Sequence, residues 1–64
     1  MYDLDTIYRR IVELKESSGH DLTVEEVQWL FDGEMLPEAV VEYLEEMSDL
    51  GYLFFDGEVV IILE

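Results

Sequence analysis

Apolar residues recur at three- and four-residue steps near the start of the chain, as in an amphipathic helix with one buried face. Asp3 stands where an N-cap residue accepts a hydrogen bond, and Tyr2 and Ile7 have the spacing of a hydrophobic staple. Gly19 can take the left-handed conformation that ends a helix. The pattern predicts a first helix over residues 3–17. Its apolar positions are Leu4, Ile7, Tyr8, Ile11 and Leu14.

The local sequence LTVEEV predicts where a second helix begins. Thr23 and Glu26 have the spacing of a capping box, and Leu22 and Val27 have the spacing of a hydrophobic staple. The sequence DGE then interrupts the helical pattern, because glycine disfavours a helix interior. We therefore expect a second helix over residues 24–32.

Pro37 suits the first position of a third helix, which we expect over residues 37–50 and which Gly51 would end. Apolar residues again recur at helical spacing across this segment, so one face of the helix should be buried. The residues expected on that face are Leu36, Ala39, Val40, Tyr43, Leu44, Met47 and Leu50.

The end of the chain predicts a β-hairpin with strands over residues 52–55 and 58–63. Asp56-Gly57 between two β-branched and aromatic runs is a strong signal for a two-residue type I′ turn, which would pair Phe55 with Glu58. That register places Tyr52, Phe54, Val59 and Ile61 on one face of the hairpin and Leu53, Phe55 and Val60 on the other.

Both faces of this hairpin are apolar, whereas a ribbon with one solvated face should alternate with polar residues. The first helix, the chain termini or a neighbouring chain could cover the second face. Alternatively, the edge of VVIIL could pair with a partner strand. We expect Phe54, Val59 and Ile61 to mediate self-association as a homodimer.

The order of these elements resembles the winged helix-turn-helix family, in which three short helices precede a β-hairpin called the wing. The resemblance rests on TVEEVQWLFDGEMLPEAVVEYLEEMSDLGYLFFDGEVVII and extends over residues 3–63. The sequence HDL at residues 20–22 stands where the family often has a short third strand. The resemblance implies an α+β fold, a single winged-helix domain over residues 1–64. A plain three-helix domain with an appended hairpin is the alternative.

The chain is strongly acidic, with seventeen acidic residues against three basic residues and a net charge of −14. The basic residues are Arg9, Arg10 and Lys15, and none follows them. Such a field repels polyanions and attracts basic protein surfaces. Adaptation to the high-salt cytoplasm of an archaeal host is an alternative origin of this acidity.

Winged-helix proteins commonly insert the third helix into the major groove of DNA and touch phosphates with the wing. DNA affinity rests largely on cations, and base reading uses mainly Arg, Lys, Asn and Gln. The third helix here offers none of these residues, so the resemblance carries over the fold without the DNA-reading residues. Its outward face would consist of Glu38, Glu42, Glu45, Glu46 and Asp49, and the wing tip of Asp56 and Glu58.

We therefore predict a non-catalytic interaction module or regulator whose acidic third helix binds a basic protein surface. Val41 could be an apolar centre within the acidic face, and Trp29 could be an interface anchor. Each of these features has an alternative explanation. The acidic face could simply be solvated, Val41 could be an isolated surface valine, and Trp29 could pack against the first helix or the wing.

A sharper form of this prediction is a DNA mimic, of the kind that viral inhibitors use to block nucleic-acid-binding proteins. The alternative function is a DNA-binding transcription regulator from a high-salt host. In that case Arg9, Arg10 and Lys15, or a partner subunit, would make the contacts with DNA.

No catalytic, metal or cofactor site is predicted. The chain has no cysteine and one histidine, His20, and it lacks the spacing of a calcium-binding EF-hand. Nucleophilic catalysis needs a serine or cysteine beside a base in a pocket, and so small a domain offers little concavity. We expect a cytoplasmic protein, because no apolar run is long enough to span a membrane and no signal pattern begins the chain.

Overall fold

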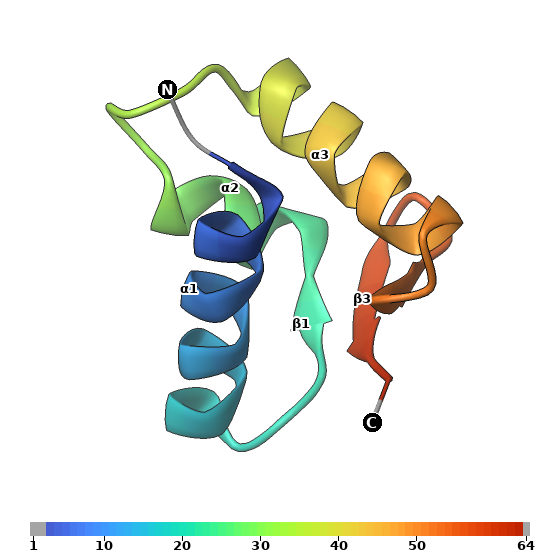
Figure 1. Cartoon of the computed structure of the whole chain (residues 1–64). Helices are drawn as coiled ribbons and strands as arrows, with labels where there is room; N and C mark the ends of the chain where they lie inside the picture. The colour runs from blue at the N-terminus through green and yellow to red at the C-terminus, as the bar shows by residue number, and fades with distance from the viewer. Residues whose placement is uncertain (1–2, 64) are drawn as a thin grey trace.

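Three helices and three short strands make up the computed structural model, which describes residues 3–63. In chain order they are α1 (Leu4–Ser18), β1 (Leu22–Thr23), α2 (Val24–Leu30), α3 (Pro37–Asp49), β2 (Leu53–Phe55) and β3 (Val59–Ile62). Figure 1 shows α1 and α2 on one side of the molecule and α3 running down towards the hairpin on the other side. The α+β fold and the predicted layout of three helices with a C-terminal hairpin are confirmed.

The start of α1 and the start of α2 are determined by local hydrogen bonds. Asp3 accepts a hydrogen bond of 2.8 Å from the Thr6 N–H. Thr23 and Glu26 form the predicted capping box, in which Glu26 N–H donates to Thr23 Oγ1 and Thr23 N–H donates to Glu26 Oε1. Because these contacts span only three residues, the sequence was sufficient to predict them. Tyr2 of the predicted staple lies outside the described residues.

The strands form an antiparallel sheet in the order β1-β3-β2. The third strand expected around residues 20–22 forms at Leu22–Thr23, where Leu22 pairs with Val60 and Thr23 pairs with Val59. β3 is therefore the central strand. Its edge at Val59 and Val60, which the sequence left open for a partner strand, is occupied by β1.

The predicted type I′ turn and the pairing of Phe55 with Glu58 are wrong, because Phe55 pairs with Val60. A type I′ turn needs positive φ at both central residues, but only Gly57 has one, at 106°. Asp56 Oδ1 instead accepts hydrogen bonds from the N–H groups of Glu58 and Val59, both 2.9 Å, and this stabilises a longer turn. The register differs by two residues, an even number, so each strand keeps its predicted faces.

One apolar core lies between the helices and the inner face of the sheet. It contains Ile7, Ile11, Leu22, Val27, Phe31, Val40, Leu44, Met47, Leu53 and Val60. Every helix and every strand contributes to it. Burial of these side chains is the main favourable contribution to folding. The chain has no cysteine, so no disulfide adds to it.

The predicted buried face of α3 is correct within the helix and wrong at both ends. Val40, Leu44 and Met47 are buried, and Ala39 and Tyr43 are half-buried. Leu36 and Leu50, however, are 68% and 56% exposed. Leu36 has an extended backbone and Leu50 follows the last helical residue, so helical spacing does not determine where their side chains point.

The outer face of the hairpin remains partly open. Phe54 is 48% exposed, and Val59 and Ile61 are half-buried. At one end of this face the ring of Tyr52 contacts that of Tyr8 from α1, with 5.6 Å between the ring centroids. The first helix therefore reaches the start of the hairpin, while Phe54 stays in contact with solvent.

Candidate functional site

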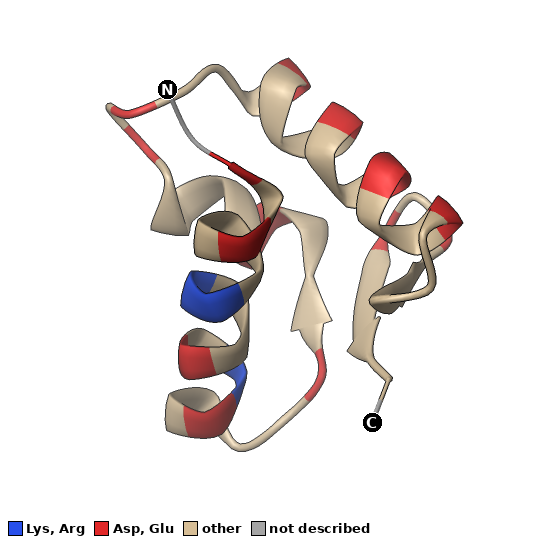
Figure 2. Cartoon of the chain, viewed as in Figure 1, with Lys and Arg blue, Asp and Glu red and all other residues tan. Residues whose placement is uncertain are grey.

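The outward face of α3 is an exposed row of acidic residues, and Figure 2 marks acidic positions along this helix in red. Its members are Glu38, Glu42, Glu45, Glu46 and Asp49, and all are exposed. Among residues 3–63, the ion pairs are Arg9 with Asp5, Arg10 with Glu34, and His20 with Glu26. None of them involves an acid of α3, so this face presents uncompensated negative charge.

This row of carboxylates makes α3 less stable than a mixed-charge helix would be. Glu38 and Glu42, and likewise Glu42 and Glu46, stand four residues apart, and each like-charge pair costs a few tenths of a kcal/mol. The last turn also carries no basic residue, although the helix dipole favours positive charge there. Local helix stability therefore does not account for this arrangement.

The acidic face of α3 continues towards the tip of the hairpin. Val41, Glu45, Phe55, Asp56 and Gly57 line a shallow hollow of about 320 Å³. The structure thus brings together three residues that the sequence predicted for the interface: Val41, Glu45 and Asp56. Val41 is half-buried there and is accompanied by Phe55.

Glu58, the other predicted residue of the wing tip, lies elsewhere. It lines a separate hollow with Thr23, Val24, Glu25 and Val59. Its carbonyl oxygen accepts a 2.8 Å hydrogen bond from Val24 N–H. The two acids of the wing tip therefore do not form one site.

Asp56 has a structural role in addition to its position beside α3. The pKa of Asp56 lies below its ordinary value of 3.8, because its carboxylate accepts hydrogen bonds from backbone N–H groups. The Val59 N–H has the larger effect and the Glu58 N–H the smaller one. The carboxylate therefore holds the turn of the hairpin through Oδ1.

Two of the three basic residues of α1 contact acidic groups within the molecule. Arg10 Nη1 lies 2.8 Å from Glu34 Oε1, and its guanidinium carbon lies 4.6 Å from the ring centroid of Phe31. Arg9 pairs with Asp5 at 3.4 Å. These contacts partly neutralise the cations that the alternative DNA-binding function would require.

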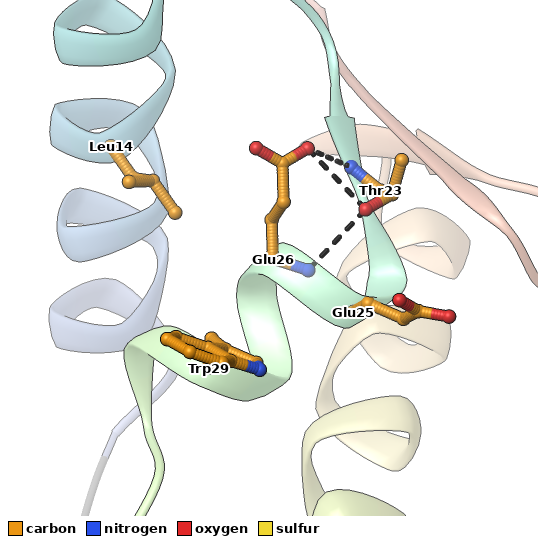
Figure 3. A pocket seen from close by; sticks show the side chains of 5 residues that line it. All are labelled: Leu14, Thr23, Glu25, Glu26 and Trp29. Carbon is orange, nitrogen blue, oxygen red and sulfur yellow. Dashed lines mark hydrogen bonds between the residues drawn. The ribbon is translucent and has the colours of Figure 1, made fainter.

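Trp29 is 84% exposed, so the alternative in which it packs against the first helix or the wing is wrong. Figure 3 shows it beside an open groove between α1 and α2, about 380 Å³ in volume. Leu14, Thr23, Glu25 and Glu26 complete the lining. Sequence reasoning missed this groove, although Glu25 and Glu26 precede Trp29 by the four and three residues that place side chains on one helix face.

The described residues contain no group of three His, Cys, Asp or Glu side chains that could hold a metal ion. His20 is exposed, and its Nδ1 lies 2.8 Å from the carbonyl oxygen of Asp21.

Between residues 3 and 63, no helix combines the length and the apolar character needed to cross a membrane. The surface features that stand out are therefore the carboxylates of α3 and the groove beside Trp29.

No protein-family model, curated protein or solved structure gives a significant match to this chain.

Proposed function

We propose that this protein is an unusually acidic member of the winged-helix family and a non-catalytic module that binds a basic protein surface. The acids of α3 provide the binding charge, and Val41 with the neighbouring Phe55 provides an apolar contact at one end. The observation that carries the proposal is the exposed row of five acids on α3, none of which has an ion-pair partner among residues 3–63.

Charge and fold together favour a protein partner over DNA. A helix in this position of a winged helix is the one that meets DNA, but its five carboxylates would repel phosphates. The same carboxylates attract a basic surface, and the half-buried Val41 adds area that can be desolvated in a complex. In its most specific form the proposal is that α3 mimics the negative charge of DNA and occupies the DNA-binding surface of another protein.

The proposal is tested by a triple variant, Glu38→Gln, Glu42→Gln and Glu45→Gln. Immobilised wild-type protein should capture basic nucleic-acid-binding proteins from lysate, and added duplex DNA should compete for them. The triple variant should lose this capture, because the charge of α3 is removed while its shape is retained.

A matched control carries Glu13→Gln, Glu16→Gln and Asp32→Asn. These three residues are exposed and lie outside α3, so the control has the same net charge as the first variant. Capture should survive in this control. If both variants lose capture equally, overall charge is responsible and the α3 site is wrong.

Binding to labelled duplex DNA, followed by fluorescence anisotropy, tests the alternative of a DNA-binding regulator. We expect no binding at about 100 mM salt, because the charge of α3 opposes it. Salt-sensitive binding that is lost on Arg9→Gln or Lys15→Gln would overturn the proposal in favour of DNA recognition by α1.

We also propose that the outer face of the hairpin mediates self-association through Phe54, Val59 and Ile61. Phe54 is the most exposed of the three side chains. The net charge of −14 opposes association of two copies, so salt should promote it. Sedimentation at low and high salt should show a dimer that Phe54→Ser abolishes, and a monomer under both conditions would contradict this.

A further inference from the structure

The groove between α1 and α2 combines an apolar wall with negative charge. Leu14 from α1 and Trp29 from α2 supply the apolar surface, and Figure 3 shows the carboxylate of Glu26 between Leu14 and Thr23. Trp29 has the largest exposed fraction among the exposed large apolar side chains of residues 3–63, at 84%. So large an exposed ring is typical of an interface anchor.

Glu26 has one oxygen that is hydrogen-bonded within the fold and one that has only His20 within ion-pair distance among the described residues. Oε1 accepts hydrogen bonds from Thr23 N–H at 3.0 Å and from Thr23 Oγ1 at 3.3 Å. Oε2 lies 3.7 Å from His20 Nε2, which is longer than a hydrogen bond. Among residues 3–63, no lysine or arginine forms an ion pair with Glu25 or Glu26.

The chain itself shows how an aromatic ring and a carboxylate can hold a guanidinium group. Arg10 lies over the ring of Phe31 and pairs with Glu34 at 2.8 Å. Trp29 and Glu26 offer the same two chemical groups on the exposed side of α2. Tryptophan is also the aromatic residue that binds cations most strongly.

We propose that this groove binds an arginine side chain from a basic protein segment. The aliphatic part of the arginine would lie along Leu14, and the guanidinium would stack on the indole of Trp29 and pair with Glu26 Oε2. The site extends the proposed function, since both surfaces take a basic protein. It does not depend on the acids of α3, so each can fail without the other.

Trp29 is the only tryptophan in the chain, so its fluorescence reports on this groove directly. The experiment titrates the full chain with a short capped peptide of alternating glycine and arginine, at low ionic strength where charge pairs are least screened. The emission of Trp29 should change and saturate. A peptide with lysine in place of arginine should bind more weakly, because its ammonium group cannot stack on the indole.

Glu26→Gln is the decisive variant. Glutamine is also accepted at this position of a capping box, so the start of α2 should be retained and the melting temperature nearly unchanged. The dissociation constant reported by Trp29 should rise roughly two- to fivefold, as expected for losing one surface ion pair. Glu13→Gln removes the same charge from an exposed position of α1 that lies outside both the groove and α3, and it should leave that constant nearly unchanged.

Three results would overturn the proposal. The first is an emission change that does not saturate. The second is an equal effect of Glu13→Gln and Glu26→Gln, which would show that only overall charge matters. The third is equal or tighter binding of the lysine peptide, which would exclude stacking of a guanidinium. None of these results bears on capture of a basic protein by the acids of α3.

Discussion

α1 and α3 are both amphipathic helices that bury one face in the same core, yet their charges are arranged differently. α1 carries three bases and three acids, and it pairs Arg9 with Asp5. α3 carries five acids and no base. The negative charge is therefore not spread evenly over the molecule, and balanced charge on one helix argues that the unbalanced charge on the other has a local role.

The two helices should be equivalent in the core, and this sets the baseline for the comparison. Ile11 of α1 and Leu44 of α3 are both fully buried. We expect Ile11→Ala and Leu44→Ala each to lower the free energy of unfolding by about 2–5 kcal/mol, measured by urea denaturation. If only one of them is destabilising, the core is not shared as described.

A positive charge on the outer face should stabilise α3. Glu42→Lys replaces two like-charge pairs, with Glu38 and Glu46, by two favourable ones, and should raise the free energy of unfolding by roughly 1 kcal/mol at low salt. The matched change Glu13→Lys on α1 adds the same charge beside Arg9, and should give a smaller gain or a loss. Equal gains would mean that the two helices do not differ in local charge balance.

Removing a base from α1 should have a smaller effect of the opposite sign. Arg9→Gln removes the ion pair with Asp5, in which both side chains are about three-quarters exposed. The free energy of unfolding should fall by about 0.3–0.5 kcal/mol, and the loss should shrink as salt is added. A stabilising effect would show that the Arg9 side chain is not held by its neighbour on the helix.

The pH dependence of stability should reveal the acids whose carboxylates hold the fold. Backbone hydrogen bonds lower the pKa of Asp56 in the folded state, so its contribution is present above the ordinary value of 3.8 and is lost as pH falls through the lower folded value. Asp3 behaves in the same way, because the Thr6 N–H lowers its pKa.

Asp56→Asn isolates this contribution, because asparagine can hold the same turn without a charge. Thermal melts across the acid range should show the wild type more stable than this variant near neutral pH, with a difference that diminishes below about pH 4. A constant difference would mean that the charge of Asp56 does not matter to the turn.

Much of the fold could be predicted because its signals are local. Asp3, Thr23 with Glu26, and Gly19 set helix ends through contacts that span at most four residues. Apolar spacing also identified the buried residues within α1 and α3, because a regular helix fixes the direction of every side chain.

Prediction failed where local geometry left the regular pattern. Helical spacing was extended to Leu36 and Leu50, which lie outside α3 and are exposed. Asp56-Gly57 indicated a two-residue turn, but the side chain of Asp56 supports a longer one. A side-chain hydrogen bond can outweigh an intrinsic turn preference, since such a bond contributes about 1 kcal/mol and the preference is of similar size.

The sequence by itself determined the order of elements, the helix starts, the inner and outer faces of the hairpin, and the carboxylates along the outside of α3. These follow from short-range hydrogen bonds and from the periodicity of apolar residues. Only the tertiary structure decided that α1 lies beside α2, leaving Trp29 exposed over a groove with Leu14, and that Val41 meets the turn of the hairpin. Those neighbours come from distant parts of the chain, and only packing of the core brings them together.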